Sequence, residues 1–212
     1  MSPPWSVYRQ QGMALLLTLL ILMVVSLLGI SALRTSLFSA RMATGAEIDA
    51  MAFAAAESAI DATLGALKND PERLRSLLAG NTLTQCVTLA DPGKAGACGS
   101  GDHLDARALV VAESHARRIG YRPVVGGSVG FGTDDDGAAP RVVDYRLVIL
   151  GEATIARFGR HEYHLQIVTK RGLKPVAKTP VRDTGFSGLH RSGWYPVSQA
   201  EAEAFLASGA GE

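Results

Sequence analysis

The chain has 212 residues, of which 21 are lysine or arginine and 20 are aspartate or glutamate. This length allows one domain of ordinary size in addition to a membrane segment. The near-neutral charge, without a run of basic residues, argues against a nucleic acid as a built-in partner.

Residues 1–12 are a short polar leader that contains Arg9 and ends in Gly12. Directly behind it, the stretch from Met13 to Leu33 carries no charged side chain. A helix of this length spans about 30 Å, the thickness of the hydrocarbon core of a bilayer. A secretory signal has a shorter apolar core and a small-x-small cleavage site, whereas this core continues into an alanine-rich helical pattern. The sequence therefore predicts a single membrane span that stays in the mature chain.

Four separated motifs carry a resemblance to a known family. They are Gln11–Leu15, Leu28–Ser36, Arg41–Ala43 and Ala52–Glu57. In their order and spacing they resemble the amino-terminal region of PilX-type minor pilins of the type IV pilus.

This resemblance implies a class III signal, which the prepilin peptidase cleaves after Gly12 before Met13 is methylated. It places the leader in the cytoplasm and residues 68–212 in the periplasm while the protein is held in the inner membrane, and later at the pilus tip on the cell surface. The fold it implies is α+β, a pilin-like roll in which a long helix over residues 13–67 packs on an antiparallel β-meander.

Most pilins carry a glutamate at the fifth residue of the mature chain, thought to pair with the amino terminus of a neighbouring subunit. Here that position is Leu17. A carboxylate in hydrocarbon is costly unless it is paired. The absence of this glutamate favours a position at an end of the filament, the tip. The simple alternative is that Leu17 is another lipid-facing or core residue.

The resemblance implies a minor pilin that primes pilus assembly and joins the tip complex, in support of adhesion and twitching motility. Its implied partners are other minor pilins, the major pilin, a large tip adhesin, the prepilin peptidase and the inner-membrane assembly platform, and no cofactor is expected. Two alternatives stay open: a pseudopilin of a type II secretion system, and an uncleaved single-span protein with a periplasmic binding domain.

After Arg34 the helical pattern becomes amphipathic, and between Ile48 and Leu67 its apolar stripe consists mostly of small residues. Such a stripe lets a sheet or another helix approach closely. Asp70 is a good cap and proline is tolerated at the first helical position, so a second, short helix is predicted over Pro71–Ala79, ended by Gly80.

Cys86 and Cys98 are the two cysteines of the chain. An even count outside the cytoplasm favours a disulfide, and closing a loop of this length contributes about 3 kcal/mol in the chain-entropy model. Two cysteines without a nearby pair of histidines cannot complete a zinc site.

Residues 82–101 show no clear period apart from a turn at Asp91–Gly93, and residues 107–112 fit either a strand or the start of a helix that runs to Arg118. Residues 121–125 are expected to be extended because of Pro123. A loop is predicted over 126–137, where Asp134, Asp135 and Asp136 are a weak calcium candidate. The simpler interpretation is a solvated acidic turn.

Alternating patterns predict two strands, Val143–Ile149 and Tyr163–Val168. Turns are expected at 151–152 and 159–160, with room for a middle strand over 154–158. From about residue 172 the chain has too few apolar residues for a core, so we expect an irregular extension with a short helix near 199–206. Trp194 and Tyr195 could anchor an interface or pack back onto the sheet.

The run His161-Glu162-Tyr163-His164 superficially resembles a zinc-protease motif. That chemistry needs histidines four apart on one helical face, whereas these are three apart in a strand and point to opposite faces. No other catalytic arrangement is recognisable, so we expect a structural protein and not an enzyme.

Overall fold

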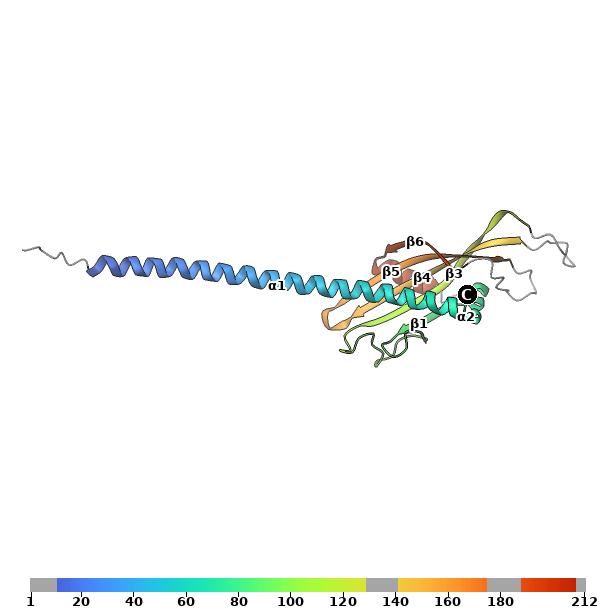
Figure 1. Ribbon diagram of the computed structural model, residues 1–212, viewed down its shortest axis with the longest axis horizontal. Helices are drawn as coiled ribbons and strands as arrows, with labels where there is room; N and C mark the ends of the chain where they lie inside the picture. Colours follow the sequence, from blue (N-terminus) through green and yellow to red (C-terminus); the bar gives the residue numbers. More distant parts are fainter. Residues whose placement is uncertain (1–10, 129–140, 175–187, 209–212) are drawn as a thin grey trace, which may run out of the picture. The chain divides into compact units, whose positions relative to one another are not determined.

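Helix α1 runs from Gln11 to Asn69 in the computed structural model, which describes residues 11–128, 141–174 and 188–208 (Figure 1). The chain divides into two units, Met1–Glu47 and Ile48–Glu212, so α1 begins in the first and ends in the second. The long helix predicted from residue 13 to residue 67 is confirmed.

In the first unit, every described side chain from Met13 to Glu47 is exposed. Two hydroxyls of the apolar stretch bond within the helix: Thr18 donates to the Leu15 carbonyl at 2.9 Å and Ser31 to the Leu28 carbonyl at 2.8 Å. Such bonds pair the hydroxyl protons of these two residues when the helix lies in hydrocarbon.

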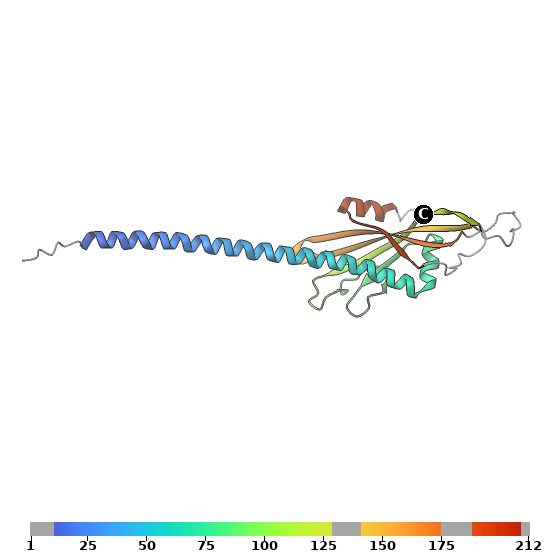
Figure 2. The same cartoon turned by 45° about the horizontal axis from the view of Figure 1, so that its top comes forward.

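The described residues of the second unit form a six-stranded antiparallel sheet in the order β2-β1-β3-β4-β5-β6. The strands are β1 (Leu83–Val87), β2 (Lys94–Ala95), β3 (Val111–Ser128), β4 (Arg141–Ile155), β5 (Arg160–Leu173) and β6 (His190–Pro196). The part of α1 from Ile48 onward and helix α2 (Pro71–Ala79) cover one face, and helix α3 (Gln199–Ser208) lies against the other (Figure 2). The predicted α+β fold with an antiparallel meander is confirmed.

The close contact of α1 with the sheet depends on small residues. Ala52, Ala56 and Ala59 are fully buried. A Cβ atom built at Gly151 would lie 2.5 Å from the carbonyl oxygen of Ala56, a distance that no real contact allows. At Gly151 the helix backbone therefore comes too close to β4 for a larger residue to fit without a shift.

The predicted turn at 151–152 is wrong, because β4 continues through Gly151 as far as Ile155. The reversal between β4 and β5 comes later, at the 3₁₀ helix η1 (Ala156–Phe158) and Gly159, whose φ is +61°. The separate middle strand over 154–158 is absent from this described stretch for the same reason. The turn at 159–160 is displaced by only a residue or two.

Larger side chains fill the core nearer the end of α1. Ile60 and Leu67 of α1, together with Leu77 of α2, pack on Tyr145 and Leu147 of β4. The Tyr145 hydroxyl donates to the carbonyl of Leu173 at 2.8 Å, so this buried ring keeps a polar partner.

Helix α2 has the predicted bounds. The Asp70 carboxylate accepts the backbone N–H groups of Glu72 at 3.0 Å and Arg73 at 3.3 Å, and Gly80 ends the helix with a φ of +112°. Both signals are local in the sequence, which is why they could be recognised there.

The region before Val111 is a loop held by one carboxylate. Asp105 accepts the backbone N–H groups of Leu109 and Val110, both at 2.8 Å. Strand β3 starts immediately afterwards, so the alternative of a helix to Arg118 is wrong, and the extended conformation expected around Pro123 is confirmed.

Strand β1 has no periodic signal and was not predicted. Of the predicted loop over 126–137, residues 126–128 belong to β3 and the rest lie outside the described residues.

The prediction of an irregular segment is wrong for residues 190–208. β6 pairs with β5 from Thr169–His190 to His164–Pro196, and α3 confirms the short helix predicted near 199–206. A strand of mostly polar residues is stabilised here by its pairing with a neighbour, which its own sequence does not indicate.

Candidate functional site

The first candidate surface is the apolar part of α1 in the first unit, which we call the apolar segment, residues 13–42. Its large apolar side chains are exposed, from Met13 at 79% and Leu17 at 61% to Met42 at 62%. Soluble proteins rarely expose so continuous an apolar surface, and α1 is long and apolar enough to cross a membrane. This segment requires a lipid or protein environment.

The residues predicted for processing lie at the start of this segment. Gly12 and Met13 belong to the first turn of α1, and Leu17 follows about one turn later. No acidic side chain occurs in that first turn, and the first one along the described helix is Glu47. An amino terminus at Met13 would thus have no carboxylate nearby on its own helix.

The predicted disulfide joins Cys86 of β1 to Cys98 in the loop after β2. Cys86 is fully buried. The backbone N–H of Cys98 donates to Glu113 Oε2 at 2.8 Å, so β3 also holds this loop. The bridge fastens the loop between β1 and β3 to the sheet.

The calcium candidates Asp134, Asp135 and Asp136 lie outside the described residues. Within the described ranges, no group of three or more histidine, cysteine, aspartate or glutamate side chains is placed to hold a metal ion.

A second cluster joins α1 to the sheet through acidic side chains of the helix. Asp49 pairs with Arg160 at 3.0 Å, and Asp61 pairs with Arg191 of β6. Both pairs are exposed, so each contributes little to stability. Between them in the sequence lies Glu57, whose contacts are more buried.

Glu57 Oε1 accepts two hydrogen bonds, from His164 Nδ1 at 2.8 Å and from Trp194 Nε1 at 2.5 Å. A carboxylate only accepts, so the proton of His164 lies on Nδ1. The imidazole is fully buried, and Phe53 lies edge-on to it with ring centroids 4.6 Å apart. We call Phe53, Glu57, His164 and Trp194 the Glu57 cluster.

Trp194 thus packs back onto the sheet and the helix, one of the two roles considered for it, while remaining 40% exposed. His161 and His164 point to opposite faces of β5, as the strand pattern predicts: His161 Nδ1 lies 3.1 Å from Thr154 Oγ1, whereas His164 faces α1.

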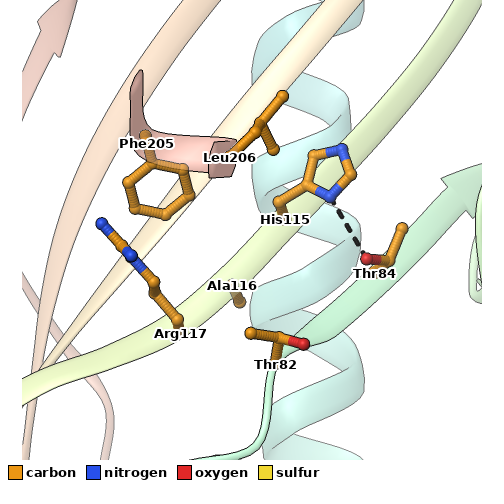
Figure 3. Close-up of a pocket in the computed structure, with 7 residues that line it drawn as sticks. All are labelled: Thr82, Thr84, His115, Ala116, Arg117, Phe205 and Leu206. Carbon is orange, nitrogen blue, oxygen red and sulfur yellow. Dashed lines mark hydrogen bonds between the residues drawn. The ribbon is translucent and has the colours of Figure 1, made fainter. Parts of the chain in front are cut away.

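On the other face of the sheet, a hollow of about 220 Å³ lies beside α3 (Figure 3). Arg117 and His115 of β3 point into it, and the Arg117 guanidinium lies over the Phe205 ring, 4.1 Å from its centroid. Both nitrogens of His115 are engaged, Nδ1 with Thr84 at 3.2 Å and Nε2 with Glu113 at 3.0 Å. The hollow is therefore the region where α3 contacts the sheet.

Two carboxylates meet on this face, since Glu113 and Glu152 are directly opposite across β3 and β4. Burial raises the pKa of Glu152, and the charge of Glu113 raises it further against the opposing effects of His115 and His161. Burial also acts to raise the pKa of Glu113, but hydrogen bonds from His115 and from the Cys98 N–H outweigh it, so that pKa is lowered.

Sequence reasoning missed His164, Arg160 and Arg191 as partners of the helix. A weak signal existed, because Glu57 closes a run of apolar and small residues, Ala52–Ala56, where a charged group requires a partner if it is buried. The identity of that partner, 107 positions away, depends on the register of β5.

The family model described as PilX N-terminal matches residues 11–61, which include the apolar segment and the helical acids Asp49, Glu57 and Asp61. Neither a curated protein nor a solved structure matches the chain. The exposed apolar helix fits a membrane-anchored pilus component. Residues 11–61 thus match the amino-terminal region of PilX-type minor pilins of the type IV pilus.

Proposed function

We propose that the protein is a minor pilin that primes pilus assembly and occupies the tip complex, in support of adhesion and twitching motility. Leu17 carries the proposal. It stands where most pilins have the glutamate that pairs with a neighbour's amino terminus, and it is 61% exposed on a helix with no acid before Glu47. A subunit without this carboxylate cannot offer a partner to a neighbour's ammonium group.

Processing is the first step in this proposal. The prepilin peptidase cleaves after Gly12 and Met13 is methylated, in the inner membrane with the second unit in the periplasm. The mass of the amino-terminal peptide, from cells with and without the peptidase, tests this step. A chain that begins with methylated Met13 only when the peptidase is present supports it, whereas a chain that begins near Met1 in both strains points to a plain membrane anchor.

The tip position is tested by Leu17→Glu, with Leu16→Glu as the matched control. Both variants add one carboxylate to an exposed position of the same helix turn, but only the first restores it at the fifth mature residue. We expect Leu17→Glu to enter the filament shaft and to reduce the number of pili per cell, as measured by immunogold labelling. Unchanged tip labelling and pilus number in Leu17→Glu would contradict the proposal.

A further inference from the structure

A cleft rich in arginine lies on the sheet face opposite α1. One hollow of about 300 Å³ is lined by Arg122, Asp144, Arg146, Ile167, Thr169 and Ser192. A second, of about 150 Å³, shares Asp144 and Thr169 and adds Arg171 and His190. The two hollows therefore adjoin, and we call them together the arginine cleft.

Three strands, far apart in the sequence, supply the charged side chains of this cleft, and a fourth, β6, adds Ser192 and His190. Arg122 of β3 is directly opposite Asp144 of β4, and Asp144 is directly opposite Arg171 of β5. Arg146 lies two residues further along β4, on the same face as Asp144. No run of basic residues is visible in the sequence because each strand contributes only one arginine.

The charges in the cleft are unbalanced. Arg171 forms a two-pronged pair with Asp144, from Nε to Oδ1 at 2.8 Å and from Nη2 to Oδ2 at 3.1 Å. In the part of the chain that the structure describes, the side chains of Arg122 and Arg146 form no hydrogen bond or ion pair. Among the described residues of the cleft, three arginines against one aspartate give a net charge of +2, and the guanidinium groups of Arg122 and Arg146 are the two that Asp144 does not pair.

The spacing of the two unused arginines fits an extended peptide. Arg122 and Arg146 are diagonal neighbours on adjacent strands, a relation that places the two residues about 7–8 Å apart and their Cβ atoms somewhat closer. Side chains two residues apart on one face of a β-strand are separated by about 7 Å. Two carboxylates in a Glu-x-Glu pattern on an extended segment therefore match the two guanidinium groups.

The remaining lining favours a peptide over a nucleic acid. Asp144 can still accept a hydrogen bond from a peptide N–H, but it would repel a phosphate backbone, which offers acceptors only. Among the described residues that line the cleft, there is no phenylalanine, tyrosine or tryptophan on which bases could stack. Ile167 supplies an apolar patch for the aliphatic part of a glutamate side chain.

We infer that the arginine cleft binds an extended acidic segment of a partner protein, through carboxylates at alternate positions that pair with Arg122 and Arg146. The arginine cleft belongs to the second unit, and the inference does not depend on the position of the subunit in the filament.

The test uses the full chain in detergent and a fluorescein-labelled peptide Thr-Glu-Thr-Glu-Thr in fluorescence anisotropy at low salt. A Thr-Gln-Thr-Gln-Thr peptide and an oligo-dT strand serve as comparison ligands. The variant Arg122→Gln/Arg146→Gln removes the two unused charges, and Arg157→Gln removes one exposed arginine from η1, outside the cleft.

We expect the acidic peptide to bind, the double variant to weaken binding at least tenfold, and Arg157→Gln to change it less than twofold. A charge-reversed variant, Arg122→Glu/Arg146→Glu, should instead bind Thr-Lys-Thr-Lys-Thr. Equal binding of the glutamine peptide, or an unaffected double variant, would overturn the inference. Tighter binding of oligo-dT that depends on the same arginines would replace it with a nucleic-acid site.

Discussion

Glu57 of helix α1 accepts a hydrogen bond from the fully buried imidazole of His164, at 2.8 Å. The two residues are 107 positions apart, and the second lies on a central part of β5. The same carboxylate oxygen also accepts the indole N–H of Trp194, from β6. One acidic side chain of the helix thus connects it to two strands that come late in the chain.

We predict that Glu57→Ala lowers the free energy of unfolding by about 1–3 kcal/mol, because the buried Nδ1–H of His164 loses its acceptor. Glu57→Gln should retain part of this stability, since an amide oxygen can accept the same bonds. Urea unfolding followed by Trp194 fluorescence measures the effect. In a chain cleaved after Gly12, Trp194 is the only tryptophan.

Asp49→Ala is the control, because the Asp49–Arg160 pair is exposed on both sides and should contribute far less. If Asp49→Ala and Glu57→Ala destabilised the protein equally, burial of His164 would not be the reason for the effect.

The second prediction concerns Gly151. Gly151→Ala should destabilise the protein by about 1–3 kcal/mol, since its Cβ would meet the Ala56 carbonyl oxygen at 2.5 Å and the Ile60 side chain at 2.8 Å. Thermal unfolding monitored by circular dichroism measures the loss.

Gly65→Ala is the matched control on α1. A Cβ there meets nothing within 4 Å, and alanine is favoured over glycine in a helix by about 1 kcal/mol. We therefore expect Gly65→Ala to raise the unfolding temperature while Gly151→Ala lowers it. A tolerated Gly151→Ala would mean that the helix can move away from β4 at little cost.

Gly151 also shows where the sequence was sufficient and where it was not. The long helix, α2, and the alternating parts of β4 and β5 could be predicted because periodicity and caps are local signals. In the sequence alone, a glycine followed by a polar residue suggests a turn as readily as a position within a strand. Only the contact with Ala56, which lies in a helix almost a hundred residues earlier in the chain, shows that a glycine is required at this point of a strand.

The same limit applies to the candidate sites. The disulfide and the membrane span over residues 13–33 were predicted, since two cysteines and an uncharged run can be recognised in the sequence itself. The Glu57 cluster and the arginine cleft were not, because each forms only when strand pairing brings together residues that are isolated in the sequence. β6 was missed for this reason too, since its few apolar residues gain their neighbours only through β5.

The third prediction concerns the disulfide. Replacing Cys86 and Cys98 by alanine should lower the free energy of unfolding by about 3 kcal/mol, chiefly because the unfolded chain gains freedom. The wild-type protein in a reducing agent should unfold at the same urea concentration as the variant. Hydrogen exchange should increase first in β1, which the bridge fastens to the loop after β2. Identical urea midpoints of unfolding for the oxidised and the reduced wild-type protein would contradict this expectation.

The last prediction concerns the facing pair Glu113 and Glu152. The pKa of Glu152 is raised in the folded protein, first by burial, so folding favours its protonated form. Its favourable contribution is complete below the pKa of the unfolded chain and is lost as the pH rises through the higher folded value. At pH 7 the ionised carboxylate therefore opposes folding, and Glu152→Gln should stabilise the protein there by up to about 1 kcal/mol, the scale of a cross-strand pair.

Glu113→Gln should instead destabilise the protein at pH 7. The pKa of Glu113 is lowered on folding, so its stabilising contribution is present above the pKa of the unfolded chain. Both differences from wild type should shrink as the pH falls to about 4, near the ordinary pKa of glutamate. Urea unfolding of both variants at the two pH values measures this. Two results would contradict this prediction: a stabilising effect of Glu113→Gln at pH 7, or a gain in stability for Glu152→Gln that persists at pH 4. Either would show that the contacts of Glu113 with the Cys98 N–H and with His115 do not shift the pKa values of the two carboxylates in opposite directions.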